Sequence, residues 1–261
     1  MIMDYFKLAD CLFGISDDFE FFMPFASCED VEPASKIVVT KKKVHLSAFG
    51  IESIPMRETI VLRDSEYGDM IDCDEKFKNI DYYPTLNSNP NKSMLLVAIY
   101  SRLCFENVLL CHSSLIDYNG HGILFVGPSG IGKTTQAELW KKYRNATIIN
   151  GDKAFIKMKD DELIGYGLPW KGSCGYCVNS STKIDAIVIL NQEKEDSIRK
   201  LSTEEAFHMF ISNVFLPHWN EKCLNSALKT LDEVLKRVPF YLLKCRPDEE
   251  AVRLTEDTVL D

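Results

Sequence analysis

The sequence GPSGIGKT, at residues 127 to 134, has the residue types and spacing of a loop that binds phosphate. It satisfies the P-loop (Walker A) pattern G-x-x-x-x-G-K-[ST], in which glycines let backbone N–H groups converge on the phosphates of a nucleoside triphosphate. Lys133 would bring a positive charge to the β- and γ-phosphates, and the Thr134 hydroxyl would ligate Mg²⁺. The predicted nucleotide-binding residues are Gly127, Ser129, Gly130, Ile131, Gly132, Lys133, Thr134 and Thr135. Of these, Thr135 is expected to be a helix residue that coordinates neither the metal ion nor a phosphate.

Two side chains outside the loop could take part in phosphate chemistry. Asp152 follows the short apolar run ATII and would meet Mg²⁺ or an acceptor hydroxyl, although Asn-Gly-Asp is also a strong turn sequence. His112 lies in VLLCHSSLID, which should run beside the strand that feeds the loop. A histidine on an apolar strand is, however, commonly a core residue with a satisfied hydrogen bond. The residues alone leave both alternatives open.

The rest of the chain lacks the motifs of two large classes of P-loop protein. The segment after Gly127 contains neither the D-x-x-G nor the N-K-x-D sequence of a GTPase switch. The best candidate for the acidic strand of a motor-type ATPase, IDAIVIL, ends in Asn191 and Gln192 in place of Asp-Glu. These observations disfavour a GTPase switch and a motor-type ATPase, but the loop motif alone does not settle what is done with the phosphate.

The elements that must position these residues indicate an α/β fold with a mixed sheet. GILFV predicts a buried strand entering the loop, and a helix is expected over residues 134–143. Asn119-Gly120 predicts a hairpin between GILFV and the strand before it. The remaining expected elements are a strand at ATII, a hairpin around Asp160-Asp161, strands at IDAIVIL and FYLLKC, helices at about 203–213 and 221–236, and a last helix after Pro247.

The first 90 residues predict a small β-rich lobe. They alternate short apolar and β-branched runs, such as KIVVT and ETIVLRD, with charged or turn-forming breaks. Turn-forming residues concentrate in PTLNSNPNKS, so we expect domains at 1–90 and 91–261. The next segment has helical spacing, with Asn91 or Ser93 as its N-cap.

Composition excludes several classes. A chain of 261 residues with 46% apolar and 26% charged residues can bury a substantial core. The net charge of −9 disfavours a broad grip on nucleic acid or an anionic membrane. The amino terminus lacks a basic region followed by an apolar one, and MLLVAIY is too short to span a bilayer. Nine scattered cysteines indicate reduced thiols, so we expect a cytoplasmic protein.

Three features together resemble the catalytic domain of HPr kinase/phosphorylase, whose nucleotide fold is related to ATP-dependent phosphoenolpyruvate carboxykinase. They are His112, the SGIGKT loop and the acidic strand end at NGDK. The resemblance covers about residues 105 to 255. GLPWKGSCGY, KIDAIVILNQ and FYLLKCRPDEEAV look more like the HPr-kinase-like proteins of peptide-modification clusters, including those that phosphorylate lasso-peptide precursors on a serine. The resemblance implies a mixed-sheet P-loop kinase domain with a small β-rich amino-terminal lobe, and it implies that the protein self-associates.

The resemblance also implies roles for individual residues. Asp152 would be the base for the acceptor hydroxyl, and His112 would orient Asp152 or share its proton. The family's paired aspartates appear here as Gly151 and Asp152, so Mg²⁺ would rely on Thr134, on the phosphates and water, and on Asp152 as a further ligand. The predicted function is ATP- and Mg²⁺-dependent transfer of the γ-phosphoryl group to a serine of a protein or peptide. A small-molecule kinase and a non-catalytic ATP-binding regulator are the alternatives.

Two weaker signals lie near residue 170. PWKGSCGYC is rich in glycine, and Lys171 in it would meet an anionic part of the substrate, unless the segment is an ordinary surface loop. Cys174, Cys177, His218 and Cys223 could form a Cys₃His zinc site, but buried free thiols are the favoured interpretation.

Overall fold

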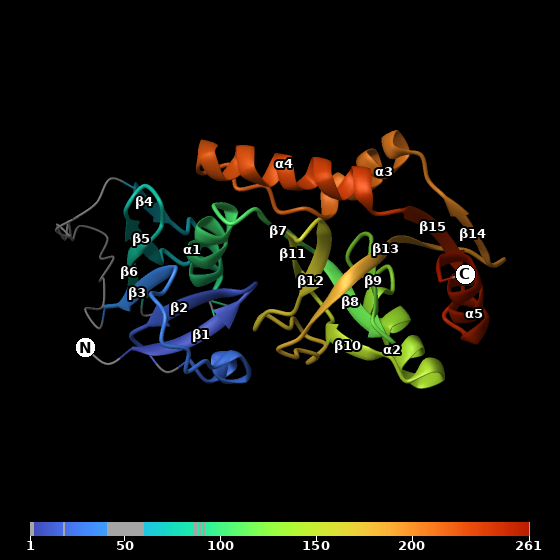
Figure 1. The fold of residues 1–261 in the computed structure, drawn as a ribbon, viewed down its shortest axis with the longest axis horizontal. Helices are drawn as coiled ribbons and strands as arrows, with labels where there is room; N and C mark the ends of the chain where they lie inside the picture. Colours follow the sequence, from blue (N-terminus) through green and yellow to red (C-terminus); the bar gives the residue numbers. More distant parts are fainter. Residues whose placement is uncertain are drawn as a thin grey trace. The chain divides into compact units, whose positions relative to one another are not determined.

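A computed structural model (Figure 1) describes residues 3–17, 19–40, 60–85, 88, 90 and 92–260. Its contacts divide the chain into two compact units, one of Met1–Glu106 with Pro217–Cys223 and the other of Asn107–Leu216 with Leu224–Asp261. The sequence places a boundary near residue 90, whereas the contacts group the helix α1 (Ser93–Cys104) with the first unit. No helix in the described ranges is long and apolar enough to cross a membrane.

The first unit is built on a six-stranded mixed sheet in the order β1-β2-β3-β6-β5-β4. β3 pairs in parallel with β2 and β6, and the other pairs are antiparallel. Its elements are β1 (Asp4–Leu8), β2 (Cys11–Ile15), the 3₁₀ helix η1 (Glu20–Phe25), β3 (Ser35–Val39), β4 (Ile60–Arg63), β5 (Met70–Cys73) and β6 (Asn79–Tyr83). The described residues of this region form six strands and one short helix, while the start of ETIVLRD lies outside the described residues.

Helix α1 begins differently from the prediction. Its N-cap is Lys92, which has a left-handed φ of 51° and makes no side-chain cap bond. Ser93 is the first helical residue, and its hydroxyl donates instead to Asp64 Oδ2 at 3.2 Å. The prediction of Ser93 as the cap was therefore wrong because a carboxylate distant in the sequence engages its hydroxyl. Asn91 lies outside the described residues.

The second unit contains a nine-stranded mixed sheet. The main path runs β10-β8-β9-β13-β12-β11-β7, and β15 joins β13 and β14 off this path. Its strands are β7 (Val108–Cys111), β8 (Ser113–Tyr118), β9 (His121–Val126), β10 (Thr147–Asn150), β11 (Ala154–Lys159), β12 (Glu162–Tyr166), β13 (Ser181–Gln192), β14 (Ser197–Lys200) and β15 (Phe240–Cys245). Its helical elements are α2 (Lys133–Arg144), α3 (Thr203–Phe210), η2 (Ile211–Asn213), α4 (Glu221–Arg237), which starts in the first unit, and α5 (Glu249–Val259).

Both faces of the central strands are buried. Along β9, Leu124 and Val126 belong to a core cluster with residues of α3 and α4, whereas Ile123 and Phe125 belong to one with residues of α2 and α5. Because successive side chains of a strand point to opposite faces, strands covered on both sides read as continuous apolar runs. This is why GILFV and IDAIVIL show no polar alternation.

Most expected elements of the second unit are confirmed, and one strand is not. Asn119-Gly120, with φ of 54° and 87°, joins the antiparallel strands β8 and β9, and Asp160-Asp161 joins β11 and β12 in the same way. VLLCHSSLID, expected as one strand, is broken at His112 into β7 and β8. β7 pairs with β11, whereas β8 pairs with β9 and β10, so the chain changes partners at the break.

Candidate active site

The glycine-rich loop connects the end of β9 to the start of α2. Gly127, Gly130 and Gly132 have φ of 144°, 79° and 109°, a region that residues with a Cβ rarely adopt. Gly132 is the N-cap of α2, so the first amides of the helix point toward the loop. The loop thus turns at three glycines before α2, with Ser129 and Gly130 exposed.

Lys133 is held inside this loop. Only 7% of the residue is exposed, and its Nζ donates to the carbonyl oxygens of Gly127 at 2.9 Å and Pro128 at 3.1 Å. Burial lowers the pKa of the Lys133 ammonium from its usual value, and the nearby charge of Asp152 acts in the opposite direction. The Asp152 carboxylate thus lies close enough to the loop lysine to stabilise its charged form.

The Asp152 carboxylate lies between two nitrogen-bearing side chains. Its Oδ2 accepts from Lys153 Nζ, and its Oδ1 is 3.5 Å from His112 Nδ1. His112 Nδ1 is closer to the main-chain oxygen of Asp152, at 2.9 Å. Burial lowers the pKa of His112, Lys133 adds to this effect, and Asp152 opposes it. A neutral imidazole at neutral pH must therefore donate from Nδ1 to the Asp152 carbonyl oxygen.

The peptide of Gly151 joins this cluster to the phosphate loop. The Gly151 carbonyl oxygen accepts hydrogen bonds from Thr134 Oγ1 at 3.1 Å and from Ser114 Oγ at 2.9 Å. Thr134, the predicted metal ligand on α2, therefore lies against the residue that precedes Asp152. The structure brings His112, Lys133, Thr134 and Asp152 together, although they come from three separate places in the sequence.

A buried asparagine, which the sequence interpretation missed, shapes the Asp152 turn. Asn150 is fully buried, and its Oδ1 accepts from the backbone amides of Asp152 at 2.9 Å and Lys153 at 3.0 Å. Its Nδ2 donates to the carbonyl oxygens of Leu168 at 2.8 Å and Trp170 at 3.3 Å. One side chain thus fixes the turn and attaches the following segment to it.

A second buried asparagine was also missed. Asn213 Oδ1 accepts from the backbone amide of Gly127 at 3.1 Å, while the Asn213 carbonyl oxygen accepts from the backbone amide of His112 at 2.7 Å. Asn213 is 5% exposed and ends the short helix η2. It connects the start of the phosphate loop to the strand break that carries His112. Only Asn150 had a local signal in the sequence, as the first residue of NGDK.

Residues 167–177 lie directly over the Asp152 turn. Gly172 has a φ of 57°, and a Cβ there would be 2.7 Å from Asp152 Cγ. A Cβ on Gly151 would lie less than 3.0 Å from Cys174 Sγ, a separation that real Cβ atoms do not reach. The space that an aspartate at position 151 would need is therefore filled by Cys174. Lys171 is exposed beside Gly172, and its carbonyl oxygen accepts from Cys174 Sγ at 2.8 Å.

Few side chains near Asp152 are of the types that bind a metal ion. Within the described ranges, no three His, Cys, Asp or Glu side chains form a group that could hold a metal ion. Cys174 and Cys177 are half-buried free thiols in the second unit, whereas Cys223 belongs to the first. Oxygen atoms of Thr134 and Asp152 are the protein groups that a magnesium ion could use here.

Comparison with known proteins gives one family. The family model described as SynChlorMet cassette protein ScmC matches residues 90–248, which include the loop, His112 and Asp152. No curated protein matches the chain. The structure titled "Structure of the Hpr(Ser) kinase/phosphatase from Coxiella burnetii" aligns with a TM-score of 0.37 and 12% identity, over 58% of this chain and 96% of that one. Because the family model matches more than half of the residues of this chain, the chain belongs to the family of the SynChlorMet cassette protein ScmC.

Proposed function

We propose that this protein is an ATP-dependent phosphotransferase that transfers the γ-phosphoryl group to a hydroxyl, with a serine of a protein or peptide as the acceptor. The observation that carries the proposal is the position of Asp152. Its carboxylate lies between His112 and Lys153 and is electrostatically coupled to Lys133, the lysine of the phosphate loop. A phosphate-binding cation and a possible base for a hydroxyl therefore belong to one site.

The residues present fit a magnesium nucleotide. Mg²⁺ binds oxygen ligands and usually keeps several waters, so one or two protein oxygens are enough when phosphates supply others. The Thr134 hydroxyl and the Asp152 carboxylate would be those two. When bound, the ion would neutralise charge on the β- and γ-phosphates. Lys133 and the loop amides would stabilise the negative charge on the transferring group, which is the main catalytic demand of phosphoryl transfer.

Asp152 would accept the proton of the acceptor hydroxyl. Lys153 Nζ donates to the Asp152 carboxylate and keeps it in a defined orientation, while His112 lies beside it. His112 uses its Nδ1–H on the main-chain oxygen of Asp152, so it would position the base and would not take the proton at that nitrogen. General-base assistance of this kind contributes roughly 10²- to 10⁴-fold to a rate.

The surroundings of Asp152 favour an acceptor carried by a polypeptide. Residues 171–173 are exposed, and Gly172 among them packs on Asp152. The Asp152 side chain is itself 19% exposed beside this segment, so a hydroxyl presented at the protein surface could approach it. A serine side chain on a flexible peptide has this property. The resemblance of GLPWKGSCGY, KIDAIVILNQ and FYLLKCRPDEEAV to HPr-kinase-like proteins of peptide-modification clusters supports the same choice.

Transfer from γ-labelled ATP with Mg²⁺ tests the proposal. Purified protein is incubated with a dialysed cell extract and, separately, with a metabolite fraction, and wild type is compared with Asp152→Asn. Asp160→Asn is the matched control, because it makes the same chemical change at an exposed hairpin turn. We expect label in a polypeptide, retained in Asp160→Asn and reduced by about 100-fold or more in Asp152→Asn.

The other outcomes separate the alternatives. Label that depends on Asp152 but appears only among metabolites would move the assignment to a small-molecule kinase. ATP binding without Asp152-dependent label in either fraction would contradict the phosphotransferase proposal and favour a non-catalytic regulator.

A further inference from the structure

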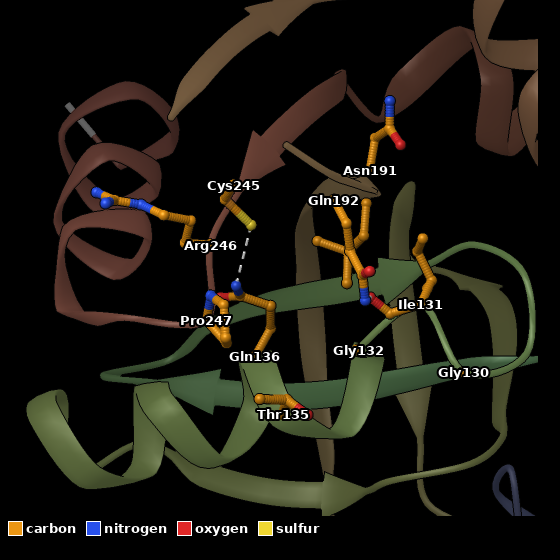
Figure 2. Close-up of a pocket in the computed structure, with 11 residues that line it drawn as sticks. Gly130, Ile131, Gly132, Thr135, Gln136, Asn191, Gln192, Cys245, Arg246 and Pro247 are labelled. Carbon is orange, nitrogen blue, oxygen red and sulfur yellow. Dashed lines mark hydrogen bonds between the residues drawn. The ribbon is translucent and has the colours of Figure 1, made fainter. Parts of the chain in front are cut away.

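A cavity of about 160 Å³ lies beside the phosphate loop (Figure 2). Its walls come from loop residues 130–132, from the first turn of α2 and from the ends of β13 and β15. β13 pairs in parallel with both β9 and β15, so the carboxyl ends of these three strands meet at the edge that carries the loop. Open α/β sheets bind ligands at that edge.

The cavity and the Asp152 cluster adjoin different parts of the loop. The walls include Thr135, one residue beyond Thr134, but none of His112, Asp152 and Lys153. On the proposed function, the γ-phosphate of a bound nucleotide lies near Lys133 and Asp152. The α-phosphate end of the nucleotide, which carries the sugar and the base, must then lie away from Asp152. The cavity lined by Thr135 is a space into which that end could extend. This step rests on the proposed function.

The size and walls of the cavity fit one ring system. Pockets for whole small ligands usually occupy about 300–1,000 Å³, so this cavity would take only part of a nucleotide. Ile131, Leu190 and Pro247 give it apolar surfaces, which suit the faces of a flat ring. Gln192 Nε2 donates to the Ile131 carbonyl oxygen at 3.2 Å and so ties the loop to the end of β13. In Figure 2 the side chain of Arg246 points away from the other lining residues.

Gln136 supplies the polar group of this wall. It is 3% exposed, and its Nε2 lies 3.2 Å from Cys245 Sγ, to which it donates. Its Oε1 is buried and has no hydrogen-bond partner within the described part of the chain. A buried amide oxygen without a partner costs free energy, and most such groups in proteins are satisfied. The terminal torsion of a glutamine is soft, so this amide can turn toward a donor in the cavity.

From these features we infer that the cavity holds the base of an adenine nucleotide, with the Gln136 amide oxygen accepting a hydrogen bond from the exocyclic amino group. Adenine carries an amino donor at position 6, whereas guanine carries an acceptor oxygen there. Because Gln136 Nε2 is engaged by Cys245 Sγ, the amide oxygen is the group that Gln136 offers to the cavity, and an acceptor there favours adenine over guanine. The apolar walls would contact the ring faces, and the triphosphate would extend from Thr135 across the loop.

Calorimetric binding of three magnesium complexes tests the inference: ATP, GTP and inorganic tripolyphosphate. Wild type should bind ATP about tenfold more tightly than GTP, the value of one well-formed hydrogen bond. Gln136→Leu should weaken ATP binding by about fivefold to tenfold and tripolyphosphate binding by less than about twofold. Lys133→Ala should weaken all three, because its charge acts on the phosphates.

A second variant guards against misfolding of Gln136→Leu. Pro247 is exposed at the rim, so Pro247→Trp should fill the cavity without disturbing the core, and should weaken ATP at least about tenfold while sparing tripolyphosphate. Equal losses of ATP and tripolyphosphate in these two variants, or equal affinities of wild type for ATP and GTP, would overturn the inference. Failure of wild type to bind any of the three would overturn the proposed function as well. If the nucleotides bind as expected but no label is transferred from γ-labelled ATP, the inference about the adenine cavity would stand, and only the proposed phosphotransferase activity would be refuted.

Discussion

Gly151→Ala should place a methyl group where Cys174 already lies. The added Cβ would be less than 3.0 Å from Cys174 Sγ, 3.3 Å from Cys174 Cβ and 3.6 Å from Tyr176 Cβ. The last separation is ordinary contact, so the sulfur is the atom that must move. The main chain at Gly151 has no positive φ, and the requirement for glycine here is therefore one of space. The Gly151 carbonyl oxygen also accepts from Thr134 and Ser114, which limits how far this turn can retreat.

Overpacking of this kind costs about 1–3 kcal/mol of unfolding free energy. Cys174→Ala alone removes the thiol hydrogen bond to the Lys171 carbonyl oxygen, which is worth about 1 kcal/mol or less. Cys174→Ala removes the sulfur atom that obstructs position 151. The double variant Gly151→Ala/Cys174→Ala should therefore be nearly as stable as the Cys174→Ala variant. The double-mutant cycle should thus give a coupling energy of about 1–3 kcal/mol in favour of the pair.

Urea unfolding followed by tryptophan fluorescence measures these energies. Trp170 lies in the segment that covers Asp152, and its carbonyl oxygen accepts from Asn150, so its emission should report on the segment. Cys28→Ala, at an exposed cysteine of the first unit, is the matched control and should give no rescue. In Gly151→Ala, Cys174 should also react faster with a thiol reagent, as located by peptide mass spectrometry. Additive effects in the cycle would refute the contact between Cys174 and Gly151.

Two further predictions concern His112 and Asn213. Since burial holds the pKa of His112 below 6.5, the unfolded chain binds more protons than the folded one as pH falls through 6.5, and stability should fall with it. His112→Gln should reduce this loss in urea unfolding between about pH 7.5 and pH 5, and an unchanged slope would contradict the assignment. Asn213→Ala removes the acceptor of the Gly127 amide and one donor to the Met209 carbonyl, so it should cost about 1–3 kcal/mol of unfolding free energy. An unchanged urea midpoint for Asn213→Ala would contradict a stabilising role of the Asn213 side chain.

Local signals account for the parts of the fold that the sequence predicted. Asn119-Gly120 specifies a two-residue hairpin turn because both residues tolerate positive φ, and the same chemistry acts at Asp160-Asp161. Helix α2 follows from the glycine loop and the apolar spacing after it. In each case the decisive residues are within a few positions of the element, so tertiary contacts need not be known.

Non-local pairing accounts for what the sequence did not predict. VLLCHSSLID reads as a single strand because its apolar residues are continuous, and the break at His112 arises only because its two halves pair with different strands. The prediction of Ser93 as the N-cap of α1 was wrong for the same reason, since the Ser93 hydroxyl donates to Asp64, which is distant in the sequence. Asn213, in a short helix after α3, has no sequence feature that connects it to Gly127 or His112. Such contacts depend on the folded chain.

The two interpretations of Asp152, as a turn residue and as a functional acid, are compatible in the structure. The turn exists because Asn150 Oδ1 accepts from the amides of Asp152 and Lys153, which is ordinary Asx-turn chemistry. The same bonds set the direction of the Asp152 side chain relative to His112 and Thr134. A strong turn sequence directly after a buried strand is therefore a means of fixing a carboxylate at the edge of a sheet. Turn propensity at NGDK does not reduce the case for a functional Asp152.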